Sequence, residues 1–211
     1  MSMNIDGEEL KELAIASSLH DIGKTKIPKY VLNRVEAWSR EERDAIKNHC
    51  IYGKEILEEI GGFSDKTIRG VLEHHERVDG LGYPFGLKGN EISKFAKIIT
   101  LSNAYDAVVN CKISKERCSL TDAYEYVLSG ADSRFDMELV QRFKETFSIF
   151  PLGSCLRLSD GIEGYVVRQN KSFPDRPVIR VLYDNITKAP IPFYEIDLVK
   201  VKNVVVESIV R

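Results

Sequence analysis

His20-Asp21-Ile22-Gly23-Lys24 is the stretch of sequence that indicates both the fold and the chemistry of this chain. A histidine beside an aspartate offers one neutral nitrogen ligand and one carboxylate that can bridge two cations. Lys24 follows Asp21 by three residues, so at the end of a helix the two side chains would share a side. Adjacent His-Asp pairs also occur as helix caps or surface pairs, so the other histidines must decide what this stretch does.

The chain has four histidines, and each lies beside residues suited to metal or phosphate. A single structural zinc needs four ligands and favours cysteine. Five nitrogen and oxygen ligands without cysteine fit a two-metal hydrolytic site of iron, manganese or similar ions better. The alternative is that every histidine is a satisfied polar core residue, each with its own buried partner. We therefore expect one or two divalent ions held by His20, Asp21, His49, His74 and His75.

Length and composition bound the class of protein. A chain of 211 residues allows one sizeable core and a smaller module. The formal net charge of −2 predicts no nucleic-acid polymer as a partner. The first ten residues hold no apolar run and no stretch is long enough to span a membrane, so we expect a soluble cytoplasmic protein without membrane insertion. No CxxC pair occurs, which predicts free thiols at Cys50, Cys111, Cys118 and Cys155.

Periodicity and capping signals predict a helical domain in the first two thirds of the chain. Asp6 is a candidate N-cap, Ser39 with Glu42 forms a capping-box pattern, and Gly61-Gly62 is a stop signal. One helix is apolar on most sides and is expected to be central. The expected helices cover residues 7–19, 39–59, 64–76, 93–110 (the central one) and 119–128, with a last one that begins at Asp136.

The segment Asp79–Gly89 contains four glycines and Pro84 in eleven residues, too many for a regular element. Such a loop can bring backbone N–H groups close to a phosphate. A plain surface turn is the alternative. Its position directly after His74-His75 favours a loop that contacts a ligand.

From Pro151 the sequence changes to short β-like runs. Two runs within 155–168 flank Ser159-Asp160-Gly161, a hairpin signal. Further runs follow at 177–183, 191–199 and 204–210. We predict a mainly α fold with two domains: a helical domain at 1–150 and a small β module at 151–211. The β module has no histidine, and interaction, packing and self-association all remain open for it.

Three motifs together resemble the HD-GYP family, a branch of the metal-dependent HD phosphohydrolases whose members degrade the bacterial second messenger cyclic di-GMP. They are HDIGK at 20–24, KNHCIYGKEIL at 47–57 and HHERVDGLGYPFGLKG at 74–89. The resemblance covers roughly residues 15–145, and the tail is similar to β modules that follow such domains in some bacterial proteins. It implies a helical HD-domain bundle with a bi- or trinuclear metal centre. It also implies a metal-bridging hydroxide that attacks phosphorus, giving a linear dinucleotide or GMP.

The resemblance also implies roles for individual residues. Asp21 matches the ligand that bridges the metals, and Lys24 matches the lysine that faces the phosphate and stabilises charge in the transition state. The remaining metal ligands match His20, His49, His74 and His75. The substrate-flanking segment matches Gly82, Tyr83 and Pro84. Three lysines stand where the family usually has arginines, two of them for phosphate contacts, and lysine keeps the charge but lacks the bidentate fork: Lys97, Lys112 and Lys115.

Two departures from the family pattern predict a weakened metal centre. Asn103, in LSNAYDAV, stands where the family has its last metal-binding aspartate, and Asp106 matches the second acid of that pattern. An asparagine oxygen can ligate a metal but brings no negative charge. The family also has a further histidine before the HD motif, and the nineteen residues before His20 contain none.

Our leading hypothesis is a metal-dependent phosphodiesterase, in full or attenuated form, that hydrolyses cyclic di-GMP or a related nucleotide. The alternative is a catalytically impaired HD-GYP-like module that binds nucleotide or a partner protein in signalling. A third hypothesis, an HD phosphohydrolase acting on a nucleotide monophosphate, is disfavoured by the GYP loop. Metal identity and number, the product, and a homodimer or signalling-protein partner remain open from sequence.

Overall fold

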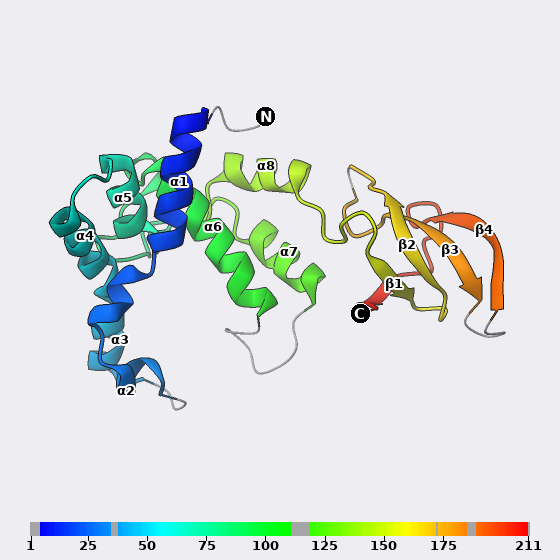
Figure 1. The fold of residues 1–211 in the computed structure, drawn as a ribbon, viewed down its shortest axis with the longest axis horizontal. Helices are drawn as coiled ribbons and strands as arrows, with labels where there is room; N and C mark the ends of the chain where they lie inside the picture. The colour runs from blue at the N-terminus through cyan, green and yellow to red at the C-terminus, as the bar shows by residue number, and fades with distance from the viewer. Residues whose placement is uncertain (1–4, 35–37, 111–118, 172, 185–188, 211) are drawn as a thin grey trace. The chain divides into compact units, whose positions relative to one another are not determined.

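The computed structural model describes residues 5–34, 38–110, 119–171, 173–184 and 189–210. The chain divides into two compact units, Met1–Arg142 and Phe143–Arg211. The first is built from helices and the second is built around a β-sheet (Figure 1). The predicted class, a helical bundle followed by a small β module, is confirmed.

The first helix, α1 (Gly7–Leu19), begins as predicted: the carboxylate of Asp6 accepts a hydrogen bond from the Glu9 N–H at 2.8 Å. It ends at His20, and the chain then turns through a 3₁₀ segment, η1 (Ile22–Lys26), and a short helix, α2 (Lys29–Leu32). The HD motif therefore lies in the turn between α1 and η1.

The single helix expected at 39–59 is two helices, α3 (Arg40–Lys47) and α4 (His49–Ile60), so this prediction was wrong in its continuity. The capping box of Ser39 and Glu42 is present. The break falls at Asn48, whose ψ of −10° departs from helical geometry. It places His49 at the first residue of α4, next to the carbonyl groups at the end of α3.

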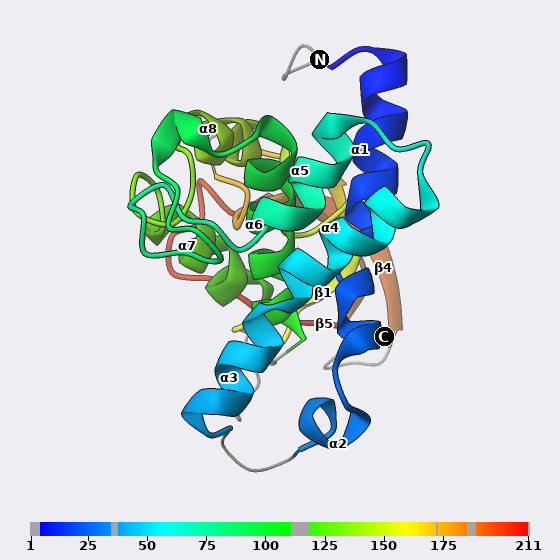
Figure 2. The same cartoon turned by 90° about the vertical axis from the view of Figure 1, so that its left-hand side faces the viewer.

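Helix α5 (Asp65–Glu73) packs against α1, α4 and α6 (Lys94–Val109), and Figure 2 shows it between α1 and α6. A Cβ atom on Gly70 would lie 3.1 Å from the Cβ of Phe95 and 3.3 Å from that of Ala16, so its glycine allows the helices to approach closely. Leu13, Ala16, Phe95 and Ile99 form a buried cluster at this crossing. The helix ends three residues before the predicted end, which makes His74 its C-cap.

The elements that follow are η2 (Gly89–Glu91), α6 (Lys94–Val109), α7 (Leu120–Ser129) and α8 (Met137–Thr146), whose last four residues lie beyond the end of the first unit at Arg142. As expected for a central helix, α6 packs against α1, α5 and α7. Asp136 caps α8 by accepting hydrogen bonds from the Glu138 and Leu139 N–H groups. Within the described part of the chain, no helix is both long and apolar enough to cross a membrane.

The second unit contains an antiparallel sheet of five strands, which along the chain run from β1 (Cys155–Leu158) and β2 (Glu163–Arg168) to β3 (Val178–Asp184), β4 (Ala189–Asp197) and β5 (Val206–Ile209). Their order in the sheet is β4-β3-β2-β1-β5. The predicted hairpin around Ser159-Asp160-Gly161 is confirmed, since β1 pairs with β2 and Gly161 has a φ of 85°. Cys50 and Cys155 are free thiols, whereas Cys111 and Cys118 lie outside the described residues.

Candidate metal centre and adjoining pocket

The carboxylate of Asp21 is the centre of the candidate site, and its two oxygens face different donors. Oδ1 lies 3.4 Å from Nε2 of His49 and 3.8 Å from Nε2 of His74. Oδ2 lies 3.4 Å from Nε2 of His20 and 2.6 Å from Nζ of Lys24. Residues from three separate stretches of sequence therefore converge on one carboxylate.

Four side chains offer ligand atoms that all lie within 4.8 Å of one another: Asp21, His49, His74 and His75. His49 and His74 are almost completely buried. His20 adjoins the group through the other oxygen of Asp21. All five predicted ligands thus lie in one region of the unit.

Backbone carbonyls orient three of the histidine rings. The Nδ1 atoms of His20, His49 and His74 lie 2.7, 2.6 and 2.7 Å from the carbonyl oxygens of Ser17, Ile46 and Val71. A carbonyl can only accept, so in each neutral ring Nδ1 carries the proton and Nε2 presents its lone pair toward Asp21. This is the tautomer that a metal ligand requires.

The donor set fits a cation. Nε2 of His49 lies 3.2 Å from Nε2 of His74, so two lone pairs face each other across a short gap. Oδ1 of Asp21 is buried and, among the described residues, accepts no hydrogen bond. Two imidazole lone pairs and an unsatisfied carboxylate oxygen in one buried place are the surroundings that a divalent ion stabilises.

The protonation states agree with this fit. Burial lowers the pKa of His49 to about 4 and that of His75 to about 2. Burial alone would raise the pKa of Asp21, but its interactions with His20, His74 and Lys24 outweigh this and hold the pKa well below its usual range. At neutral pH the site therefore presents the Asp21 carboxylate with neutral imidazoles at His49 and His75, which are the forms that bind metal, whereas the hydrogen bond to Asp21 raises the pKa of His20.

Two glycines bring the HD motif against α4. A Cβ atom on Gly23 would overlap the His49 carbonyl group and lie 2.5 Å from the Gly53 nitrogen. A Cβ atom on Gly53 would lie 2.8 Å from a methyl carbon of Val71. The backbones of η1 and α4 are thus in direct contact, and this contact sets the position of Asp21 relative to His49.

Glu76 holds the glycine-rich loop in place. Its buried carboxylate accepts hydrogen bonds from the N–H groups of Phe85 at 2.7 Å, Gly86 at 3.1 Å and Leu87 at 3.0 Å. Sequence reasoning assigned no role to this residue. The sequence did contain a signal for this role, because Glu76 lies between His74-His75 and a glycine-rich loop whose backbone N–H groups need hydrogen-bond acceptors.

The loop in turn forms one wall of the site. The ring of Tyr83 stacks on that of His75, with centroids 4.6 Å apart. A Cβ atom on Gly82 would lie 2.5 Å from the Cα of Glu76, so only glycine allows the loop to approach so closely. Of the three predicted substrate-flanking residues, Gly82 and Tyr83 line the adjoining pocket and Pro84 does not.

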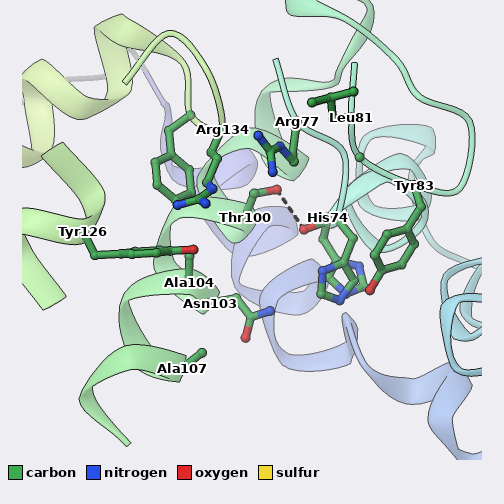
Figure 3. A pocket seen from close by; sticks show the side chains of 13 residues that line it. His74, Arg77, Leu81, Tyr83, Thr100, Asn103, Ala104, Ala107, Tyr126 and Arg134 are labelled. Atoms are coloured by element: carbon green, nitrogen blue, oxygen red, sulfur yellow. Dashed lines mark hydrogen bonds between the residues drawn. The ribbon is translucent and has the colours of Figure 1, made fainter. Parts of the chain in front are cut away.

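This pocket has a volume of about 370 Å³ and extends from the histidines to α6 and α7 (Figure 3). Asn103 lines it together with His74 and His75. Thr100 fastens α6 to the site by donating its hydroxyl to the carbonyl of His74 at 2.8 Å. Sequence reasoning missed Tyr126 and Arg134, which line the pocket from a part of the chain remote from every motif.

Of the three lysines that stand where the family usually has arginines, the structure describes only one. Nζ of Lys97 lies 2.7 Å from the Asp136 carboxylate, so Lys97 forms an ion pair at the start of α8 and does not line the pocket. Lys112 and Lys115 lie outside the described residues. Their assignment to phosphate stays a prediction.

A family model described as "HD domain" matches residues 1–139. The chain belongs to the HD domain family. A second model, "KOW domain associated with HD domain", matches residues 155–211 of this HD-domain chain.

The sequence of this HD-domain chain is similar to those of two bacterial proteins named as phosphodiesterases. It is 30% identical over 189 residues to "Cyclic di-GMP phosphodiesterase PA4108" of Pseudomonas aeruginosa, covering 90% of this chain and 45% of that protein. It is 30% identical over 137 residues to "3'3'-cGAMP-specific phosphodiesterase 3" of Vibrio cholerae, covering 64% of this chain and 29% of that protein. The chain thus spans less than half the length of these relatives.

Among solved structures, the fold matches Bd1817, a HDG"Y"P protein from Bdellovibrio bacteriovorus, with a TM-score of 0.52 and 22% identity over 64% of this chain and 43% of that one. The family match and the named relatives confirm the predicted HD-GYP resemblance.

Proposed function

We propose that this HD-domain chain is a metal-dependent phosphodiesterase that hydrolyses cyclic di-GMP or a related cyclic dinucleotide. The observation that carries the proposal is the convergence of the Asp21 carboxylate with the lone pairs of His49, His74 and His75 within 4.8 Å. The pocket that adjoins them is walled by the glycine-rich loop and is large enough to admit much of a nucleotide. The relatives named above support the choice of substrate class.

The residues divide into two groups around Asp21. His49 and His74 lie on the side of Oδ1 and His20 lies on the side of Oδ2, while His75 offers a ligand atom within 4.8 Å of those of Asp21, His49 and His74. This arrangement suits a carboxylate shared by one or two divalent ions, of which iron and manganese are our candidates. When bound, such ions would supply Lewis-acid stabilisation of phosphoryl oxygens and lower the pKa of water.

Lys24 is proposed to stabilise the transition state. Its ammonium group is held at 2.6 Å by Oδ2 of Asp21, and its side chain is 40% exposed. An ammonium group has three donors, so two remain after the contact with Asp21. We assign them to phosphoryl oxygens, whose charge grows as the reaction proceeds.

Asn103 favours a second candidate function, a nucleotide-binding module with impaired catalysis. Its carboxamide lies in the pocket with His74 and His75, where it offers an oxygen ligand but no charge. A site with too little negative charge would keep a second cation weakly. Such a protein would bind its nucleotide and turn it over slowly.

The test combines metal analysis with turnover. Protein loaded with manganese or iron should contain stoichiometric metal and hydrolyse cyclic di-GMP, and Asp21→Asn should lose both. Lys24→Met should keep the metal while turnover falls on the order of 100-fold, the usual cost of removing one charge-stabilising donor. The matched control is Lys26→Met, an exposed lysine that pairs with Glu55 at 3.3 Å.

Three outcomes decide between the functions. Metal-loaded protein that binds cyclic di-GMP without hydrolysing it would establish the binding module instead. Protein that takes up no metal would refute both the site and the reaction. Loss of metal in Lys24→Met would show that Lys24 supports the ligands instead of the phosphate.

A further inference from the structure

The far wall of the pocket is formed by a compact turn between α7 and α8. The Gly130 carbonyl accepts hydrogen bonds from the N–H groups of Arg134 at 2.8 Å and Phe135 at 3.0 Å. A Cβ atom on Gly130 would lie 2.6 Å from the ring of Phe135, which is buried. This turn therefore holds the backbone of Arg134 in a defined place.

The side chain of Arg134 is also held. Its guanidinium carbon lies 4.9 Å from the ring centroid of Tyr126, and Figure 3 shows the guanidinium over the face of that ring. The Phe135 ring meets Tyr126 edge-on, with centroids 6.3 Å apart. When a guanidinium stacks on an aromatic ring, its N–H groups point outward from its edge. There they can donate hydrogen bonds to a ligand that lies beside the stack.

The two arginines of the pocket differ in their partners. Arg77 is paired with Asp79 through both Nε and Nη2. Within the described ranges, the guanidinium of Arg134 forms neither an ion pair nor a hydrogen bond, and its contact is the Tyr126 ring. Arg134 thus brings an unused fork of donors to the pocket that His74 and His75 also line.

We propose that Arg134, stacked on Tyr126, determines nucleobase specificity by donating two hydrogen bonds to the O6 and N7 acceptors of a guanine in the bound cyclic dinucleotide. The proposal deepens the proposed function and rests on it: a phosphate at the histidine end leaves the base to occupy the remainder of the same pocket. Arginine is matched in shape and polarity to the O6/N7 edge of guanine. Adenine presents an amino donor at the position of O6, which would oppose the guanidinium.

The alternative contact for an arginine is a second phosphate, and substitution by lysine separates the two. A phosphate requires positive charge, which Arg134→Lys retains. Lysine can also donate to guanine O6 or N7, but Arg134→Lys loses the planar fork and its stacking on Tyr126, and Arg134→Ala loses the donors as well, so both variants should lose base discrimination. The expected loss is roughly 5- to 150-fold in affinity, from the 1–3 kcal/mol that a bidentate contact contributes to base discrimination.

The experiment measures dissociation constants of cyclic di-GMP and cyclic di-AMP by calorimetry on the full metal-loaded chain. Both Arg134 variants should weaken cyclic di-GMP binding and reduce the preference for it over cyclic di-AMP, with metal content unchanged. Tyr126→Leu, which removes the stacking ring, should shift the preference in the same direction. The matched control is Arg168→Ala, an exposed arginine on β2 of the other unit.

Arg134→Lys with wild-type affinity, or an unchanged preference in both variants, would overturn the inference. Wild-type protein should also hydrolyse bis(p-nitrophenyl) phosphate, a phosphodiester without nucleobases. Activity on this compound with an unchanged preference in the variants would refute base recognition alone. No activity on any phosphodiester, despite full metal loading, would refute the proposed function, and calorimetry would still decide the role of Arg134.

Discussion

At the scale of single residues, charge balance affects how many cations the candidate site can hold. Two divalent ions a few ångströms apart repel each other strongly, and anionic ligands offset that repulsion. Asp21 provides one negative charge, and Asn103, which lines the pocket beside His74 and His75, provides none. The number of ions that the site keeps should therefore depend on residue 103.

We predict that Asn103→Asp increases both the metal content and the phosphodiesterase turnover when metal is limiting, because the added carboxylate offsets cation repulsion. Elemental analysis and turnover should be measured for both forms across a manganese or iron titration. Asn90→Asp, the same change at an exposed position of the same unit, is the control. Equal stoichiometry and turnover in the Asn103→Asp and wild-type proteins would show that asparagine is a competent ligand here.

At the scale of elements, the glycine-rich loop depends on one buried carboxylate. We predict that Glu76→Gln destabilises the protein by about 2 kcal/mol, because an amide cannot accept from all three loop N–H groups. The loop should also exchange its amide hydrogens faster and the Michaelis constant should increase. Urea unfolding, hydrogen exchange over residues 80–88 and steady-state kinetics provide the measurements.

Glu58→Gln is the matched control, since Glu58 pairs with Lys54 on the exposed face of α4. Unchanged exchange in the loop of Glu76→Gln would show that other contacts hold it.

The ion pair between α6 and the start of α8 gives a pH-dependent prediction. Burial alone would raise the pKa of Asp136, but the hydrogen bond and charge of Lys97 outweigh it and lower this pKa. The ionised Asp136 carboxylate therefore stabilises the folded state. This contribution is complete above the pKa of an aspartate in the unfolded chain, about 3.9, and is lost as the pH falls through the lower pKa of Asp136 in the folded protein. Lys97→Met should therefore cost about 1 kcal/mol at pH 7, with a difference from wild type that shrinks below about pH 4.

Urea midpoints of the metal-free proteins between pH 7 and pH 2 would measure this difference. Lys54→Met, which breaks an exposed pair, is the control. A difference that is constant over this range would mean that Lys97 acts through packing and not through Asp136.

Local signals in the sequence predicted most elements and the residue types of the site. The side chains of Asp6 and Ser39 cap their helices as expected, because caps depend on residues only three positions apart. The HD-GYP motifs likewise indicated the candidate ligands that the fold brings near Asp21. Whether each of them binds metal or substrate stays a prediction.

What could not be predicted depends on tertiary contacts. The break at Asn48 and the early end of α5 occur where histidine rings turn toward Asp21, and no local pattern specifies them. Arg134 lines the same pocket as His74 and His75 because α6 and α7 pack together, although nearly sixty residues of sequence separate it from His75. Glu76 has its partners nine to eleven residues away in a loop without periodicity.

At the scale of the whole molecule, the chain is two compact units and the candidate ligands all lie in the first. We predict that removal of residues 151–211 leaves the metal content unchanged, because the second unit contains no histidine. Elemental analysis together with circular dichroism of the shortened protein would test this. A shortened protein that stays helical but loses its metal would mean that the β module completes the site.

The contact of Gly23 with the His49 backbone has a consequence for how the protein binds a metal ion. Main chain lies directly on main chain there, so no side-chain rotation can separate the two ligand-bearing segments. Folding of the chain therefore positions the candidate donor atoms, and a metal ion should bind to a preformed site. In contrast to a zinc finger, which folds only when its ion binds, this protein should release and rebind its metal ion while it remains folded.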